Sequence, residues 1–150
     1  MRRARFWLLV GASGWLLSFS LAPAQPPWKQ QALELLDEGH DQKARKVLLK
    51  VVRQQAGDEE AQALLGQIAF NRKEYEEAAV RFAKAPSVLQ VNPLLLVNYA
   101  EALLESNAGA YARRVLQKVP EEDAIAQFES GLLLARHREY AASESHLLLA

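Results

Sequence analysis

Residues 70–85 read FNRKEYEEAAVRFAKA, and residues 135–150 read ARHREYAASESHLLLA. Both stretches place a charged turn before the dipeptide Glu-Tyr. Both continue with apolar residues three and four positions apart, which is the spacing of one helical face. The recurrence of the same turn and helix predicts internal repeats, and repeats of this kind indicate stacked helical units whose core is built between neighbours.

The helical spacing of apolar residues continues from Pro27 to the end of the chain. Almost no segment alternates with a period of two, so we predict an all-α protein. Gly, Asn and Pro residues interrupt the pattern at regular intervals. The segment 87–92 is apolar and is assigned to no helix. The predicted helices form four hairpins and span residues 27–38, 41–55, 59–71, 74–85, 93–106, 109–119, 121–137 and 139–150.

Small residues recur at equivalent positions of these hairpins. Two antiparallel helices approach to about 8–10 Å only where no large side chain stands at their crossing. We therefore expect the small residues of the first and second helices to face each other, Ala32 against Ala44 and Gly66 against Ala78. Shifts of 34, 34 and 31 residues align Ala32, Gly66, Ala100 and Gly131 in the first helices, and Ala44, Ala78, Ala112 and Ser143 in the second.

These features resemble the tetratricopeptide repeat family. The resemblance covers residues 25–150 and implies a right-handed superhelical solenoid of about four repeats, at 25–58, 59–92, 93–123 and 124–150. Only the first repeat carries Trp, and the fourth begins three residues early with Ser143 in place of Ala. Helical repeats with a different hairpin angle are the structural alternative. The matching features are the 34-residue period, the set Trp28, Ala32 and Leu35, the pair Leu65-Gly66, Tyr75 and Tyr140 at the starts of second helices, the Ala44 and Phe82 columns, and Pro86 and Pro120 after second helices.

The resemblance also implies a concave groove, lined by the first helices, that holds a peptide or a partner helix. Its mixture of Leu and Phe with amides and carboxylates suits an amphipathic helix or an extended apolar segment, and Phe70 and Leu104 are the strongest candidates for contact. Any of the apolar members could instead pack against the next repeat. The predicted groove residues are Leu33, Leu36, Gln67, Phe70, Asn71, Val97, Glu101, Leu104, Phe128 and Leu132.

The amino terminus has the features of an export signal. A basic start, MRRAR, precedes 17 residues without a charge, and Ala22-Pro23-Ala24 supplies the small-residue pattern for cleavage. We predict a signal peptide at 1–24 and a periplasmic or secreted protein. The alternative is an uncleaved membrane anchor at 6–22, although Gly and Ser residues weaken that reading.

The composition offers little for catalysis. The chain has no Cys, and none of its three His residues has the spacing that places two imidazoles on one helical face. It contains no Gly-rich phosphate loop and no nucleophile elbow. Without Arg2, Arg3 and Arg5 the chain holds 15 basic and 18 acidic residues, which disfavours nucleic-acid binding. We predict no enzyme activity, no cofactor and no metal.

Charged residues near helix ends have structural explanations. We expect Gly39 to stop one helix in a left-handed conformation and Asp41 to cap the next. The acidic runs 58–60 and 121–123 are expected in first helical turns, where negative charge is favoured.

Together these observations predict an exported scaffold that binds a peptide or partner protein without catalysis of its own. The last predicted repeat is followed by no polar capping helix. The alternative is therefore the amino-terminal repeat arm of a larger exported enzyme or membrane-tethered assembly factor, whose other domain lies beyond residue 150.

Overall fold

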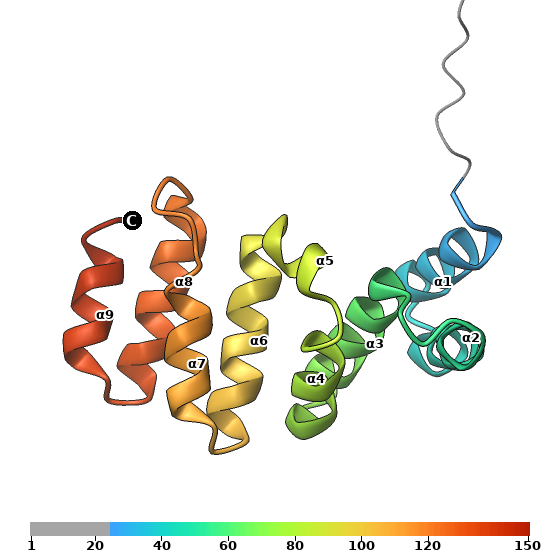
Figure 1. Ribbon diagram of the computed structural model, residues 1–150, viewed down its shortest axis with the longest axis horizontal. Helices are drawn as coiled ribbons and strands as arrows, with labels where there is room; N and C mark the ends of the chain where they lie inside the picture. Colours follow the sequence, from blue (N-terminus) through green and yellow to red (C-terminus); the bar gives the residue numbers. More distant parts are fainter. Residues whose placement is uncertain (1–24) are drawn as a thin grey trace, which may run out of the picture.

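The computed structural model describes residues 25–150, and this part of the chain is entirely helical, without a strand. The all-α prediction is thereby confirmed for these residues, whereas the predicted signal segment at 1–24 lies outside them. No helix within 25–150 combines the length and the apolar character needed to cross a membrane. The helices, labelled in Figure 1, are α1 (Pro27–Asp37), α2 (Asp41–Gln54), α3 (Glu59–Asn71), α4 (Tyr75–Phe82), α5 (Pro86–Gln90), α6 (Pro93–Glu105), α7 (Gly109–Leu116), α8 (Ala124–Arg136) and α9 (Tyr140–Leu147).

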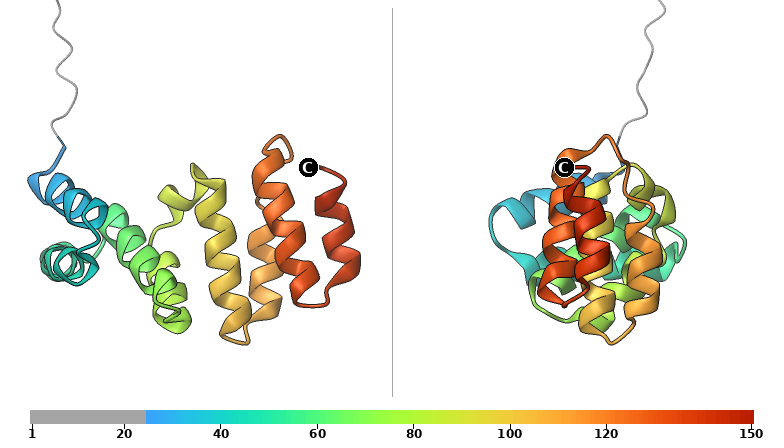
Figure 2. Two further views of the ribbon diagram at one scale, coloured as in Figure 1. Left: turned by 180° about the vertical axis from the view of Figure 1, so that it is seen from behind. Right: turned by 90° about the vertical axis from the view of Figure 1, so that its left-hand side faces the viewer.

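The helices pack as four consecutive pairs. α1 packs on α2, α3 on α4, α6 on α7, and α8 on α9, each across a short turn. The pairs follow one another along the long axis of the molecule (Figures 1 and 2). Contacts between α2 and α3, α4 and α6, and α6 and α8 join successive pairs.

The turn inside every pair has the same backbone conformation. Gly39, Lys73, Asn107 and Arg138 have φ of 73°, 61°, 60° and 61°, and they are separated by 34, 34 and 31 residues. In the first turn the N–H of His40 donates to the carbonyl of Leu35 at 2.7 Å and that of Gly39 to Leu36 at 2.9 Å, and the other turns have equivalent bonds. This pattern is the Schellman motif, in which a left-handed residue ends the helix. The turns therefore keep the period that the sequence shows.

Gly39 confirms the predicted left-handed stop, but Asp41 does not cap α2. Asp41 is the first helical residue, and the preceding residue, His40, makes no side-chain cap hydrogen bond. The carboxylate of Asp41 contributes negative charge in the first turn instead.

All eight small residues of the two aligned columns are buried. The side chain that lies on Gly66 belongs to Phe82 rather than to Ala78. Ring atoms Cδ1 and Cε1 of Phe82 stand 2.7 Å from the place that a Cβ at Gly66 would occupy. Leu147 lies on Gly131 in the same way. The small residues thus admit the large side chain one turn further along the second helix.

The core consists of two clusters that meet at α3. One joins α1, α2 and α3 and includes Leu48, Leu65 and Ile68. The other extends from α3 to α8 and includes Phe82 and Leu116. Because α3 contributes to both clusters, it connects the first helix pair to the rest of the molecule.

Helix boundaries differ from the prediction at several ends. The second helices α4, α7 and α9 end at Phe82, Leu116 and Leu147 rather than at 85, 119 and 150. α4 ends at Phe82, and Pro86 begins the additional short helix α5, because proline is tolerated in a first helical turn. α8 begins at Ala124 rather than 121, because the Asp123 carboxylate accepts from the N–H of Ala126 at 2.9 Å and caps the helix. Glu121 and Glu122 therefore lie before α8, not in its first turn.

Candidate functional site

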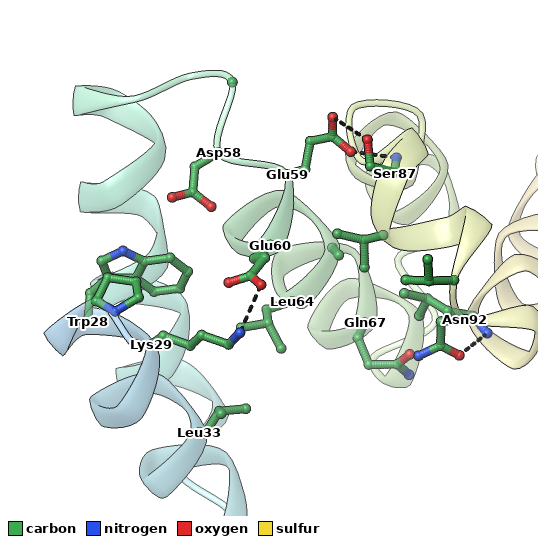
Figure 3. A pocket seen from close by; sticks show the side chains of 16 residues that line it. Trp28, Lys29, Leu33, Asp58, Glu59, Glu60, Leu64, Gln67, Ser87 and Asn92 are labelled. Atoms are coloured by element: carbon green, nitrogen blue, oxygen red, sulfur yellow. Dashed lines mark hydrogen bonds and ion pairs between the residues drawn. The ribbon is translucent and has the colours of Figure 1, made fainter. Parts of the chain in front are cut away.

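A pocket of about 800 Å³ lies between α1, α3, α5 and α6. Its apolar lining comes from each of these helices and the turn after α5, and includes Val91 and Leu95. Leu33 and Leu64, labelled in Figure 3, contribute from α1 and α3. Trp28 stands at one end of the pocket. We call this pocket the groove.

The charged side chains that line the groove are engaged with one another or with the backbone. Lys29 Nζ lies 2.8 Å from Glu60 Oε1, which joins α1 to α3. Glu59 accepts hydrogen bonds from the backbone N–H of Ser87 at 2.6 Å and from its hydroxyl at 3.2 Å, which anchors α5 to α3. Asp58 accepts from the N–H of Ala61 at 2.9 Å and caps α3. The apolar side chains are consequently the part of the lining most available to a ligand.

Polar contacts also connect the first helices of the later pairs. The Asn98 amide donates to Gln67 Oε1 at 3.1 Å, and Gln67 Nε2 donates to Asn71 Oδ1 at 2.8 Å. Arg136 Nη1 lies 3.7 Å from Glu101 Oε1, linking α8 to α6. Together with the Lys29 ion pair, these contacts run along α1, α3, α6 and α8 in order.

Second helices have their own cross-links. Arg45 of α2 donates to both carboxylate oxygens of Glu77 on α4, at 3.1 and 2.9 Å. Arg113 of α7 donates to Glu139, the residue before α9, at 2.6 Å. First helices are thus tied to first helices and second helices to second helices.

The predicted groove residues differ in exposure: some are exposed, some are partly buried, and Val97 is buried. Leu33, Phe128 and Leu132 are exposed hydrophobic side chains, with 38%, 50% and 42% of their surface accessible. Leu33 and Gln67 line the groove itself. Asn71 is also exposed. The partly buried members of the predicted set are Leu36, Gln67, Phe70, Glu101 and Leu104.

Val97 lies in the hydrophobic core and not on an accessible surface. Only 5% of its surface is exposed, and it belongs to the cluster that extends from α3 to α8. The position is one turn before Glu101 in α6, and the packing of α6 between α4 and α8 covers it. We therefore leave Val97 out of the candidate surface.

Phe70 and Leu104, the two strongest candidates from the sequence, both pack partly against the core. The Phe70 ring makes an edge contact with Tyr75, with centroids 5.9 Å apart. Burial raises the pKa of Tyr75, and the nearby carboxylates of Glu105 and Glu101 raise it further. This neutral aromatic pair supports the α3–α4 turn, so substitution of Phe70 would disturb the fold as well as the surface.

Further apolar side chains are exposed at equivalent positions of α6 and α8. Leu94 and Ile125, each the second residue of its helix, expose 45% and 66% of their surface. With Phe128 and Leu132, they extend the apolar surface of the first helices beyond the groove. We call these four residues the α6–α8 patch.

The sequence did not predict the wall that α5 gives to the groove. Val88 and Val91 line the groove from α5 and its end, and Val91 is 81% exposed. Pro86 was the available signal, because proline is as compatible with the first turn of a helix as with the segment that follows a helix. The apolar segment that follows Pro86 could therefore have been predicted as a helical turn.

Within residues 25–150 there is no group of three or more His, Asp or Glu side chains arranged to hold a metal ion. Comparison with protein-family models finds none that matches this chain. A search of curated proteins also finds no match.

Proposed function

We propose that the protein is an exported repeat scaffold, similar to tetratricopeptide repeat proteins, that holds an apolar segment of a partner protein along its first helices. The repeated turn geometry supports the repeat assignment, since left-handed residues end α1, α3, α6 and α8 at intervals of 34, 34 and 31. Such repeats bind partners on extended surfaces because each unit contributes one helix to the same face.

The groove between α1, α3, α5 and α6 is the observation that carries the proposal. Its volume of about 800 Å³ falls in the range of sites that hold ligands of substantial size. Its acidic groups already have partners, because Glu60 pairs with Lys29 and Glu59 accepts a hydrogen bond from Ser87. An apolar occupant would therefore leave these polar contacts intact, whereas a charged one would compete with them.

The α6–α8 patch supports an elongated partner rather than a compact ligand. Leu33 in the groove and Leu132 in the patch are exposed at equivalent positions of α1 and α8. Polar contacts along the first helices link the groove side of the molecule to the patch. An amphipathic helix presents apolar residues at intervals of three and four and can meet separated apolar surfaces with one face. We therefore favour an amphipathic helical segment.

Export is the part of the proposal that depends on residues 1–24. A basic start, a charge-free apolar stretch and Ala-Pro-Ala support cleavage after Ala24. Expression in a secreting host followed by intact-mass measurement should give a mature protein that begins at Gln25. A mature protein that retains Met1 would favour the membrane anchor.

The binding proposal is tested by affinity capture from the exported fraction with four baits. These are the parent, Leu33→Glu, Phe128→Glu and the control Val80→Glu, whose site on α4 is also exposed and lines no part of the groove. Prey captured by the parent and the control but lost with both Leu33→Glu in the groove and Phe128→Glu in the α6–α8 patch supports the proposal. A synthetic helical segment from that prey should then bind the parent and Val80→Glu more tightly than it binds Leu33→Glu and Phe128→Glu. Equal capture by all four baits would refute it.

A further inference from the structure

A second pocket, of about 660 Å³, lies between α4, α5, α6 and α7. It shares no lining residue with the groove, although α5 and α6 contribute to both. We call it the aromatic pocket, because Phe82, Tyr99 and Tyr111 line it. The function proposed above makes no use of it.

Buried apolar side chains form one part of the aromatic pocket. Phe82, Leu89, Leu96 and Val115 are each at most 6% exposed and still border the pocket. The rings of Phe82 and Tyr99 pack with centroids 6.0 Å apart. This surface suits an apolar body, since contact with it would remove hydrocarbon from water on both sides.

The charged lining of the aromatic pocket is entirely basic. Arg114 and Lys118 line it, and no Asp or Glu does. Within residues 25–150 neither cation is in an ion pair, whereas the neighbouring Arg113 pairs with Glu139 at 2.6 Å. The Arg114 guanidinium lies 5.5 Å from the ring centroid of Tyr111, a stacking contact that leaves its N–H groups available to an anion.

Tyr99 adds a neutral donor to the aromatic pocket. Burial raises the pKa of Tyr99, and Tyr111 raises it further, so the hydroxyl stays protonated near neutral pH. This hydroxyl has no hydrogen-bond partner among the described residues. It can donate to an oxygen atom of a bound ligand.

We propose that the aromatic pocket binds a small apolar monocarboxylate, with its hydrocarbon body against Phe82 and Leu96 and its carboxylate at Arg114 and Lys118. Charge complementarity selects the anion, because two unpaired cations line the pocket without an acidic residue. A peptide fits less well, since an extended peptide needs polar partners along its main chain and Gln90 is the only amide side chain in the lining.

The test is calorimetric titration of the purified protein with decanoate, kept below its micelle-forming concentration. We expect saturable binding with one ligand per chain and no saturable binding of decanol or of decyltrimethylammonium. Arg114→Gln should weaken decanoate binding about tenfold, which is the effect of losing one charge-assisted interaction. Arg113→Gln is the matched control and should change the affinity less than about twofold, because that neighbouring arginine lies outside the lining.

Fluorescence of a Trp7→Phe, Trp15→Phe variant, which retains Trp28, distinguishes the two pockets, because Trp28 lines the groove and not the aromatic pocket. Decanoate that binds as proposed should leave Trp28 emission unchanged. The proposal is overturned if decanoate does not bind saturably, if the two arginine variants bind it with equal affinity, or if decanol binds as tightly as decanoate. It is also overturned if Trp28 emission changes in parallel with the heat of decanoate binding. It is also overturned if an apolar peptide blocked at its carboxyl end displaces decanoate more effectively than free acids do. None of these results depends on a partner for the groove.

Discussion

The ring of Phe82 fills the space in which a side chain at Gly66 would stand. Two of its atoms lie 2.7 Å from the Cβ position, a distance that real Cβ contacts do not show. Phe82 is fully buried, so its ring has little freedom to move away. The absence of a side chain at Gly66 is therefore a condition for the packing of α3 on α4.

Gly66→Ala should lower the free energy of unfolding. Overpacking costs about 1–3 kcal/mol, and the better helix propensity of alanine offsets about 1 kcal/mol of that. Thermal and urea denaturation followed by circular dichroism would measure the change. Gly57→Ala is the control, because no atom lies within 4 Å of its Cβ position, and we expect a change under about 0.5 kcal/mol. If Phe82→Leu in the Gly66→Ala background restores nothing, the ring is not the cause of the loss.

Replacement of Lys73 by glycine should stabilise the protein. Lys73 has φ of 61°, a conformation that costs an L residue about 1–2 kcal/mol, whereas glycine adopts it freely. The greater backbone entropy of glycine in the unfolded chain offsets part of this gain, so we expect about 0.5–1 kcal/mol from denaturation curves. Gly39→Ala, at the equivalent turn with φ of 73°, should change stability in the opposite direction. Destabilisation by Lys73→Gly would show that the lysine side chain outweighs the backbone term.

The repeat could be predicted from the sequence because small residues and turns keep a fixed spacing. That spacing identified the buried positions Ala32, Ala78 and Ser143 and the left-handed residue Gly39, all of which the structure confirms. It did not identify Lys73 as left-handed, because a lysine carries no signal for that conformation. The hydrogen bonds of the turn, from the Glu74 N–H to the carbonyl of Ala69 and from the Lys73 N–H to that of Phe70, hold this conformation whatever the residue type.

The candidate site was less predictable than the fold. Residues chosen by their phase in the repeat proved exposed where the helix faces solvent, as at Phe128, and buried where a neighbour covers it, as at Val97. Phase alone cannot distinguish these cases, because the covering helix is distant in sequence. The contribution of Val91 depends on α5, whose single turn is too short to produce a periodic pattern.

Gln62 and Gln127 should each be sensitive to replacement by leucine. Both are buried at the same position of their helices, and each amide holds the chain before its helix. Gln62 donates to the carbonyl of Ala56 at 3.0 Å, and Gln127 donates to those of Val119 and Pro120 at 3.2 and 3.0 Å. Loss of these partners leaves carbonyls unsatisfied.

We expect each Gln→Leu substitution to cost about 1–3 kcal/mol in denaturation experiments. The equivalent position of α6 is Leu96, which is also buried, so leucine itself is compatible with the site. Leu96→Met is a suitable control and should cost less than about 1.5 kcal/mol. Leucine variants as stable as the parent would mean that water satisfies the freed carbonyls.

The stability of the α8–α9 pair should fall as the pH drops below about 6.5 because of His146. Its Nδ1 contacts Gln127 Oε1, and since the Gln127 amide nitrogen donates to two backbone carbonyls, Nδ1 carries the proton of the neutral ring. Burial lowers the pKa of His146 from its ordinary value of 6.5. Between that lowered pKa and 6.5 the unfolded chain binds more protons than the folded one, so this contribution to stability is complete above 6.5 and decreases with falling pH.

Melting curves at pH 7.5 and 5.5 test this dependence in the range where carboxylates stay ionised. His146→Asn removes the titration while placing an amide donor near Nδ1, and it should reduce the difference between the two melting temperatures. Ser145→Asn, at an exposed position of α9 that carries no titratable side chain, is the control and should leave the difference unchanged. A parent and a His146→Asn variant with the same pH dependence would show that another group is responsible.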